Sequence, residues 1–449
     1  MMKSGEKVQA WKLFQLLLLA AATFAATYGR FTLGSLQETM RLNLDLSDNQ
    51  VSWLQGPAMA IPMALGSVPI GLLVDRHSRA RLFIVFAALS LAATALTAFS
   101  SNINVLFIAR CLAGLASAAT LIAAFSLVGD LYVPAQRGRA TMVVLMGEIG
   151  GAPAAFALGG VLLTMSSGVS ATFGLEGWRQ ALLWMCAPLL PIVLLLLMLR
   201  EPPRTGVVVK NPSVREVWPQ LWRYRLVVVP LLLARVMVWI ADGAVLVWAA
   251  PTFARSFGLS PDRIGAIMAT SLLVSGILGP LLGGPLADFC QRSGGPRRTV
   301  SAMCVLALLS VPAALFSITP NASLASFTLA AFLMLGFTIG TMALTIATIV
   351  IPGELRGLYV AITITVGATF SIGVAPLLVS GLSGVLGGPA KIGLALAIVC
   401  VTTSILGALV FSIGRRYFPG DESPGHPGKE NLRSGGANVA LKEHPTPNS

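Results

Sequence analysis

Long apolar stretches alternate with short polar ones along almost the whole chain. A hydrocarbon core about 30 Å thick is crossed by about 20 helical residues, and the chain offers twelve apolar segments of about that length. These predicted spans lie near residues 13–36, 51–74, 82–100, 104–128, 139–164, 179–199, 226–250, 263–287, 299–318, 323–347, 357–382 and 391–414. The pattern predicts an all-α integral membrane protein with twelve transmembrane helices, and the even number places both termini on one side.

A polar, proline-bearing stretch from Arg200 to Tyr224 separates the first six spans from the last six. We interpret it as a linker that contains a short amphipathic helix around residues 214–222. The predicted domains are an N-terminal six-helix bundle over 1–199, a cytoplasmic linker over 200–225, a C-terminal six-helix bundle over 226–414 and a disordered cytoplasmic tail over 415–449. The tail is rich in Pro, Gly, Ser and charge and lacks apolar periodicity, which is typical of disorder.

The composition supports a membrane protein, because 55% of the residues are hydrophobic and only 11% are charged. The net charge of +13 is high enough to suggest a nucleic-acid partner, so the placement of the basic residues matters. With the N-terminus inside, 23 of the 31 lysines and arginines lie on cytoplasmic segments, five on the opposite loops and three within spans. Positively charged loops resist translocation, so we expect a plasma (inner) membrane protein with both termini cytoplasmic and no nucleic-acid partner.

Two short patterns recur at similar offsets in the two halves of the chain. Gly71 to Arg76, after the second span, reappears as Gly284 to Asp288 after the eighth, at an offset of 213 residues. Pro134 to Gly138, before the fifth span, reappears as Pro352 to Gly357 before the eleventh, at an offset of 218. Internal repeats of this kind are common in transporters, and they predict two similar bundles related by pseudo-symmetry.

Three groups of residues stand out as motifs: Gly71, Asp75, Arg76, Arg79 and Arg81 in the loop between the second and third spans, Arg110, Gly114 and Ala118 in the fourth span, and Gly147, Gly151, Pro153, Gly159 and Gly160 in the fifth. They resemble the signature loop, the fourth-span arginine pattern and the fifth-span glycine-proline pattern of the major facilitator superfamily. The resemblance covers nearly all of the chain except the termini and the linker. Residues 28–33, 46–50 and 247–251 are similar to bacterial spinster-type members. The resemblance implies a secondary transporter in which two bundles rock about a central site.

The chain departs from the spinster-type pattern at two positions that bear on energy coupling. Such proteins usually carry an aspartate before the first-span arginine and a glutamate seven residues after the fourth-span arginine. Here these positions are Gly29 and Ser117. The acids that the resemblance would nominate as proton carriers are therefore missing, and another group has to be found.

Five ionisable residues lie inside the predicted spans, where an unpaired charge is costly and usually functional. They are Arg30, Arg110, Arg235, Glu148 and Asp242, with a formal excess of one positive charge. That excess favours an anionic or zwitterionic substrate. We expect the three arginines and Asp242 to contact substrate together with Tyr28, whose ring and hydroxyl are available for stacking and hydrogen bonding.

Arg30 and Asp242 occupy nearly equivalent places in the two halves, because the offset of 213 carries position 30 to 243. Both are therefore predicted to face the central cavity, although an ion pair between them that only locks one conformation is an alternative. Glu148, well inside the fifth span, and Asp242 are the candidate proton carriers. Glu148 has a structural alternative as well, a buried ion pair for which Arg110 is the nearest candidate by span.

The loop after the second span supplies the candidates for gating. They are Gly71, Asp75, Arg76, Arg79, Arg81, Asp130 and Asp288. The resemblance implies a conformational latch, in which Asp75 approaches the positive N-terminal end of a helix in the other half. The alternative is a loop that only anchors the topology.

Other classes of function lack the residues they would need. The five cysteines are scattered, the three histidines fall in loops or the tail, and there is no phosphate-binding glycine loop, so we expect no enzyme, no metal and no cofactor. We expect a monomeric symporter or antiporter that moves a small organic anion or amphiphile across the bilayer, with protons as the candidate coupling ion. The alternatives are efflux of lipid-like or drug-like molecules and a non-transporting membrane sensor or scaffold.

Overall fold

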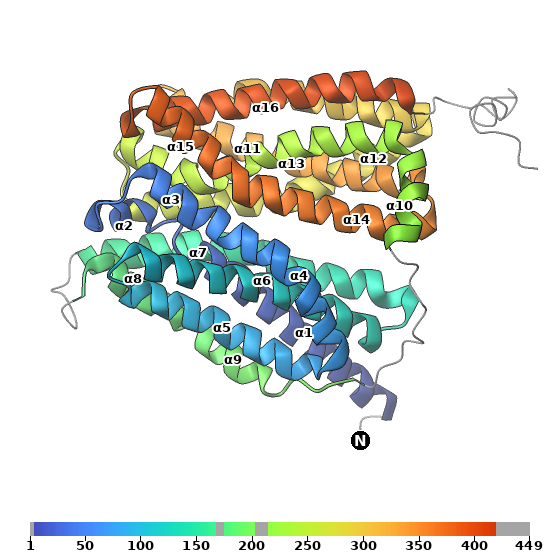
Figure 1. The fold of residues 1–449 in the computed structure, drawn as a ribbon, viewed down its shortest axis with the longest axis horizontal. Coiled ribbons are helices and arrows are strands. Elements are labelled where there is room, and N and C mark those ends of the chain that lie inside the picture. The colour runs from blue at the N-terminus through green and yellow to red at the C-terminus, as the bar shows by residue number, and fades with distance from the viewer. Residues whose placement is uncertain (1–3, 168–174, 203–213, 419–449) are drawn as a thin grey trace, which may run out of the picture.

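A computed structural model describes residues 4–167, 175–202 and 214–418, and all regular structure in them is helical (Figure 1). The first half forms α1 (Ser4–Phe31), α2 (Gln37–Asn43), α3 (Asp48–Gln55), α4 (Pro57–Arg76), α5 (Arg79–Phe99), α6 (Ile103–Leu131), α7 (Pro134–Ser167), α8 (Gly177–Cys186) and α9 (Leu189–Leu196). The second half forms α10 (Val214–Arg223), α11 (Arg225–Phe257), α12 (Pro261–Ala313), η2 (Ala314–Ile318), α13 (Ala322–Val350), α14 (Gly353–Ala368), η3 (Thr369–Val374), α15 (Ala375–Val385), η4 (Pro389–Lys391), α16 (Ile392–Gly414) and η5 (Arg415–Tyr417). The amphipathic helix predicted in the linker is present as α10, and the predicted tail from 419 onward lies outside the described residues.

All twelve predicted spans are found. Ten helical stretches of the described chain are long and apolar enough to cross a membrane, and the other two spans are accounted for as follows. One of the ten, Pro261–Ile318, contains two spans, because Gly294 and Gly295 leave helical geometry and divide α12. Gly295 has a φ of 63°, which glycine adopts without the steric penalty of a Cβ. The remaining span is α4, with 20 residues. The prediction of an all-α protein with twelve transmembrane helices is confirmed.

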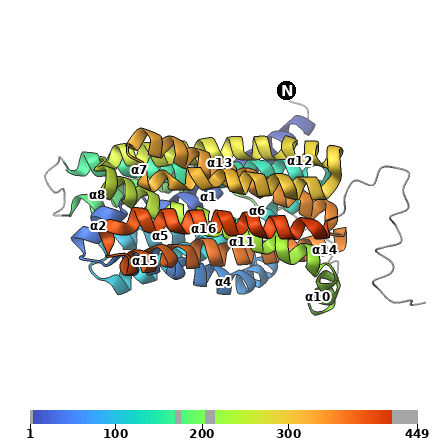
Figure 2. The same ribbon diagram turned by 90° about the horizontal axis from the view of Figure 1, so that it is seen from above.

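The helices form two bundles that lie one above the other in Figure 1. The first contains α1 and α4 to α9, and the second contains α11 to α16. We call the end where the described chain starts and stops the terminal end, and the end that carries α2 and α3 the capped end. Two seams join the bundles, one between α7 and α12 and the other between α4 and η3. Figure 2 shows α7 and α12 along one edge of the molecule and α4 along the opposite edge.

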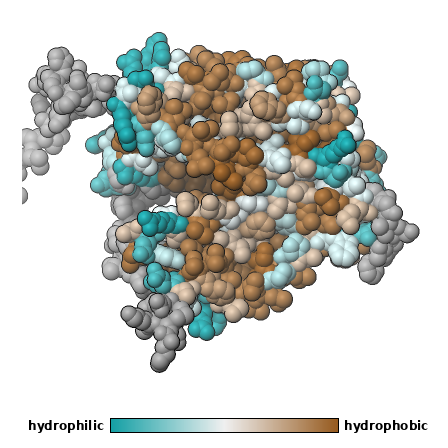
Figure 3. Space-filling model, turned by 180° about the vertical axis from the view of Figure 1, so that it is seen from behind, coloured by the Kyte–Doolittle hydropathy of each residue, from teal (hydrophilic) through white to brown (hydrophobic). Residues whose placement is uncertain are grey.

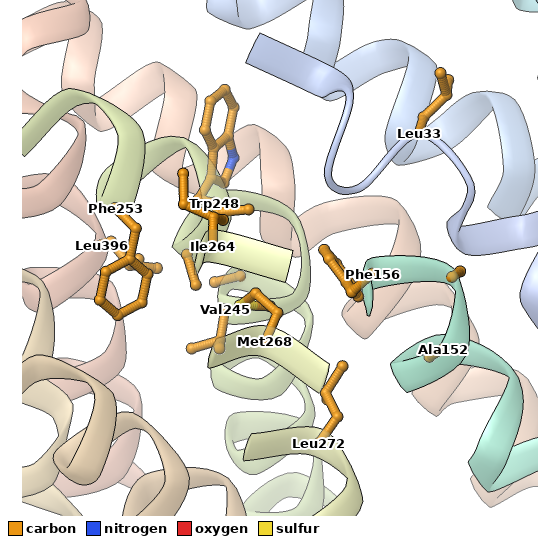
Figure 4. Close-up of a cluster of buried hydrophobic side chains, with 14 of the residues drawn as sticks. Leu33, Ala152, Phe156, Val245, Trp248, Phe253, Ile264, Met268, Leu272 and Leu396 are labelled. Carbon is orange, nitrogen blue, oxygen red and sulfur yellow. The ribbon is translucent and has the colours of Figure 1, made fainter. Parts of the chain in front are cut away.

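The hydrophobic cores show that the bundles are joined at the capped end. The largest core cluster draws residues from both bundles, including Phe156 of α7 and Met268 of α12 (Figure 4). Toward the terminal end each bundle has a core of its own, one around Phe83 and Leu127 and the other around Met303 and Phe411. Apolar packing among the described residues thus closes the interface at one end only.

The short helices α2 and α3 reinforce this closure. The side chain of Ser47 caps α3 in a reciprocal capping box with Gln50, which fixes where the helix starts. Ser52 Oγ of α3 donates to the carbonyl of Pro376 in α15 at 2.8 Å, and Ser380 Oγ of α15 donates to Asn49 Oδ1 at 3.0 Å. These hydrogen bonds join the two halves of the chain across the capped end.

The surface of the molecule is that of a membrane protein. Figure 3 shows hydrophobic residues across the middle of one face and hydrophilic residues gathered toward the two ends. Large apolar side chains such as Leu65, Phe327 and Val385 are 73%, 73% and 85% exposed. A protein surrounded by water rarely exposes so much contiguous apolar surface, whereas a bilayer accepts it.

The α7–α12 seam depends on a close approach of two glycines. A Cβ on Gly160 would lie 2.4 Å from the carbonyl oxygen of Pro261, and a Cβ on Gly265 would lie 2.4 Å from that of Phe156. Neither backbone leaves room for a side chain. Small residues at a helix crossing allow the dispersion contacts that hold membrane helices together.

Replacing Gly160 with valine should therefore separate the bundles at this seam and lower the thermal stability of the detergent-solubilised protein by several degrees, since overpacking costs about 1–3 kcal/mol. The matched control is Gly381→Val in α15, where no described atom lies within 4 Å of the place that a Cβ would occupy. Thermal unfolding followed by tryptophan fluorescence measures both. Equal melting temperatures for the two variants would contradict the role of this crossing.

Candidate functional site

A small cavity lies between the two bundles, on the terminal side of the closed interface. Its lining comprises Arg30, Phe31, Gly34, Gln55, Met59 and Arg110 of the first bundle and Gly243, Leu246, Val247, Ser371 and Ile372 of the second. Both halves of the chain therefore contribute to it, and among the described residues its charged lining consists of arginines alone. We call it the central cavity.

Arg110 is buried in the wall of the central cavity, with 2% of its surface exposed. Its Nη2 donates to the backbone carbonyl of Arg30 at 2.7 Å and to Gln55 Oε1 at 3.0 Å. Gln55 is oriented in turn by a hydrogen bond from its Nε2 to Gln37 Oε1 at 3.1 Å. Within the described chain, Arg110 Nε has no hydrogen-bond partner and no carboxylate forms an ion pair with the guanidinium. The positive charge is held in place by neutral acceptors and remains available to an anion.

Arg30 connects the central cavity to a second cavity inside the first bundle. Its guanidinium lies 4.9 Å from the ring centroid of Phe31, and its Nε also lacks a hydrogen-bond partner among the described residues. The second cavity is lined by Arg30 together with Glu148 of α7 and Ser117 of α6, among others. The arginine that shares a cavity with Glu148 is thus Arg30, whereas Arg110, the candidate partner by span, lines the central cavity instead.

Asp242 does not face the same cavity as Arg30, and this corrects the expectation drawn from the repeat. It lines a cavity inside the second bundle, where its Oδ1 would lie 2.7 Å from a Cβ on Gly336. Gly243, the residue at the repeat offset, lines the central cavity opposite Arg30. Successive helical residues point about 100° apart, so a difference of one position turns the aspartate away. The alternative of an Arg30–Asp242 ion pair is likewise not found among the described ion pairs.

The two remaining candidates lie in different surroundings. Arg235 is on α11, with its guanidinium 4.5 Å from the ring centroid of Trp239 and its buried Nη1 without a hydrogen-bond partner in the described part of the chain. Tyr28 is in the hydrophobic core, 2% exposed and stacked on Phe24 with ring centroids 6.0 Å apart. Its hydroxyl therefore points into packed protein. The roles in substrate binding given to both residues remain predictions.

The sequence matches a known family over just over half of its length. A model described as Major Facilitator Superfamily matches residues 19–248. The chain belongs to the major facilitator superfamily. It is a multi-pass membrane transporter for a small molecule, and the expectation of a transporter in place of an enzyme is confirmed.

Individual relatives and structures agree with this assignment. The chain is 27% identical over 398 residues to an MFS-type efflux pump of Mycolicibacterium smegmatis, covering 85% of this chain and 87% of the pump. It is 30% identical to NiaP of Bacillus subtilis, named as a candidate niacin/nicotinamide transporter, over 107 residues that span 24% of this chain and 26% of that protein. Among solved structures, a bacterial homologue of the human lysosomal transporter Spinster in an inward-facing, unoccupied conformation superimposes with a TM-score of 0.75 at 19% identity, covering 91% of this chain and 96% of that one. A D-xylose–proton symporter gives a TM-score of 0.67 at 16% identity, covering 91% and 98%.

The gating candidates of this superfamily member are only partly brought together at the terminal end. Arg79 forms an ion pair with Asp130, another of the gating candidates, and a second with Glu201 at 2.9 Å. Arg76, Arg81 and Asp288 are exposed, Gly71 has open space beside it, and the side chain of Asp75 lies outside the described residues. The latch implied by the resemblance therefore remains a prediction.

Glu201 joins Arg79 and Asp130 in a cluster of charged residues, although its position in the sequence had assigned it to the linker. Its carboxylate accepts hydrogen bonds from the backbone N–H of Ala80 at 2.8 Å and from Ser78 Oγ at 3.0 Å, besides that from Arg79. Burial raises the pKa of Glu201, but these hydrogen bonds outweigh burial and hold the pKa below its usual value. The ionised carboxylate ties the start of α5 to the segment that follows α9.

An ion-pair network at the capped end was missed altogether, and among the described ion pairs it is the one that joins the two halves of the chain. Arg255, near the end of α11, donates to Glu38 Oε2 of α2 at 2.9 and 2.7 Å and to both carboxylate oxygens of Asp48 of α3 at 2.8 Å. Arg41 also donates to Glu38, at 2.8 Å. We call these four residues the capped-end clamp. Burial raises the pKa of Glu38, but the hydrogen bonds from Arg41 and Arg255 outweigh burial and keep its pKa below the usual value, so the Glu38 carboxylate is ionised at neutral pH.

Arg255 is 207 residues from Asp48 and 217 from Glu38 in sequence. Each of the three lies in a segment whose sequence indicates only a polar loop or the end of a helix. No local pattern distinguishes them from topology-setting charges. The available signal was the presence of three acids, Glu38, Asp45 and Asp48, in the first predicted outer loop and of Arg255 in the fourth.

Replacing Arg255 with glutamine should open the capped end, because it removes charged hydrogen bonds worth about 1.5–3 kcal/mol each and leaves two carboxylates side by side. A cysteine introduced at Val247, in the central cavity, should then react at least about tenfold faster with a membrane-impermeant thiol reagent added from the capped side. The background is a variant whose five native cysteines are replaced. Arg263→Gln, at an exposed arginine of the same end, is the matched control and should leave the rate unchanged. An unchanged rate in the Arg255 variant would show that the clamp does not hold this end closed.

Proposed function

We propose that the protein carries a small organic anion through the membrane by alternating access, with the central cavity as its substrate site. The observation that carries this proposal is the pair of arginines, Arg30 and Arg110, in a cavity built from both bundles and with no carboxylate among the described residues of its lining. A charge in a low-dielectric site is stabilised by an opposite charge or by water. An anionic group that accepts hydrogen bonds from the free Nε positions would supply the missing partner.

The apolar part of the lining sets the character of the rest of the substrate. Phe31, Leu246, Val247 and Ile372 surround the arginines with aromatic and aliphatic surface. An aromatic or aliphatic carboxylate matches this combination of one anionic group and an apolar body. Nicotinate is one compound of this class to test, given the name of the B. subtilis relative.

The conformation of the structure corresponds to one of the two end states of the proposed transport cycle. The capped end is closed by the shared core and by the clamp, whereas the bundles have separate cores at the terminal end. Positively charged loops concentrate at the terminal end, which supports a cytoplasmic location for it and for both termini in the plasma membrane. On this assignment the structure is the inward-facing state, and rocking of the bundles breaks the clamp to expose the cavity to the outside.

Glu148 is the proposed site of proton coupling. It shares a cavity with Arg30 and with Ser117, one of the two positions where the spinster-type acid is missing. A carboxylate on α7 thus takes the place of one on α6 within the same cavity. When Glu148 is ionised it attracts the guanidinium of Arg30, and when it is protonated Arg30 is free to bind the substrate anion, so proton and anion enter together. Asp242, near Arg235 in the second bundle, is the second candidate for coupling.

A second candidate function is efflux of amphiphilic or drug-like molecules. The match to the M. smegmatis efflux pump over 85% of this chain favours it, as does the apolar lining of the central cavity. The site and the monomeric state proposed here are the same in both cases. The direction of transport and the response to an anionic group separate the two.

Proteoliposome uptake tests the anion proposal. A panel of radiolabelled aromatic and aliphatic carboxylates, with neutral amides of the same shape as controls, should yield at least one anion whose uptake saturates while its amide is not carried. Arg110→Gln should reduce that uptake at least about tenfold, because a charged hydrogen bond to a buried group is lost. Arg263→Gln is the control. Equal transport of anion and amide, or full activity of Arg110→Gln, would contradict an anion site in this cavity.

The coupling proposal has its own signature in the same assay. Glu148→Gln should abolish uptake driven by an imposed pH gradient, while exchange of internal for external substrate continues, because exchange needs no net proton movement. Asp242→Asn is the comparison variant. Loss of both activities in Glu148→Gln would instead assign Glu148 to substrate binding or to packing.

A further inference from the structure

A groove on the outside of the first bundle is not used by the proposed transport cycle. It lies at the terminal end, between the start of α1 and the start of α7, with a cavity volume of about 540 Å³. Its polar lining includes Lys12, Tyr132 and Arg139, and its apolar lining includes Leu13, Leu16 and Val143. Its described lining residues are distinct from those of the central cavity and of the cavity of Glu148.

The groove is built by the way the chain passes from α6 to α7. The hydroxyl of Tyr132, which follows α6, donates to the backbone carbonyl of Lys12 at 3.1 Å and holds α1 near the turn. Arg137 Nε donates to the carbonyl of Tyr132 at 3.1 Å and fixes the first turn of α7. The helices α1 and α7 meet closely deeper in the bundle, where a Cβ on Gly147 would lie 2.1 Å from the carbonyl oxygen of Ala20. Between this contact and the terminal end, the groove lies between the two helices.

The charge of the groove has one sign. Lys12 and Arg139 are the charged residues of its described lining, which contains no aspartate or glutamate. Because α7 begins at Pro134, the partial positive charge of a helix N-terminus lies at the same place. The site therefore attracts an anionic group.

The position of the groove indicates which anion. Both helices end their membrane spans here, so the cationic side chains lie at the level of lipid headgroups, and Leu13, 54% exposed, continues the groove toward the hydrocarbon. Hydrophilic residues border hydrophobic surface at this end of the first bundle in Figure 3. A soluble anion would use the charges but not the apolar surface.

We propose that this groove binds an anionic phospholipid, with its phosphate between Lys12 and Arg139 and an acyl chain along Leu13, Leu16 and Val143. The lipid bridges the first turns of α1 and α7. These two helices carry Arg30 and Glu148, so the bound lipid contacts the elements that hold the transport charges. Lipid headgroups lie at this depth in both leaflets, so the proposed site fits an anionic lipid whichever side of the membrane the terminal end faces.

Native mass spectrometry of the full-length protein with added lipids tests the proposal. Dioleoylphosphatidylglycerol should bind more tightly than dioleoylphosphatidylethanolamine. Lys12→Gln combined with Arg139→Gln should weaken binding of the anionic lipid by about fivefold for each charge removed, with little effect on the zwitterionic one. The matched control is Arg263→Gln combined with Lys391→Gln, which removes the same charge from exposed positions of the capped end.

Three results would overturn the proposal: equal affinity for the two lipids, an equal loss of affinity in the control pair, or displacement of the lipid by an equal concentration of sn-glycerol 1-phosphate. The last would assign the site to soluble anions. If the double variant is not monodisperse on size exclusion, Arg139→Gln alone replaces it, since Arg139 is exposed, and a loss of about fivefold is expected.

Discussion

The contact of Arg255 with Glu38 and Asp48 is the polar interaction that ties the two halves of the chain together at the capped end. It is the described ion-pair network that crosses between them, and it lies beside the one described core cluster that both bundles share. The hydrophobic effect does little to hold the bundles together within a membrane, because lipid tails are as apolar as the helix surfaces. The clamp supplies a specific, breakable contact at one end, so the bundles are held together there and have separate cores at the other.

The charged side chains inside the membrane also need partners. Among the described residues, Arg110 is held by a backbone carbonyl and an amide, Arg30 by the proximity of an aromatic ring, and neither by a carboxylate. The Nε of each guanidinium also lacks a hydrogen-bond partner among the described residues. On the proposed function, a substrate anion supplies the missing negative charge, and its loss leaves the two guanidinium groups without an opposite charge in the central cavity.

Several features of the fold were predictable because they depend on local runs of residues or on patterns repeated along the chain. Helices long enough to cross a bilayer are set by runs of apolar residues, and the two-half plan by patterns repeated at offsets of 213 and 218 residues. The direction of a side chain was not predictable to the same degree. Asp242 and Gly243 are neighbours in sequence, yet one lines a cavity of the second bundle and the other lines the central cavity. An uncertainty of one residue in aligning the repeats was enough to reverse that assignment.

The sequence by itself determined the twelve helices, the two bundles, the family and which charged residues lie within the spans, since each of these depends on hydropathy, spacing or motif. Only the tertiary structure decided which of these charges meet. It placed Glu148 with Arg30 in one cavity, joined Arg79 to Glu201, and brought Arg255 to Glu38 over 217 residues of sequence. The physical reason is that Coulomb and hydrogen-bond energies depend on distances of a few ångströms, and those distances are set by helix rotation and by the packing of the two bundles against each other.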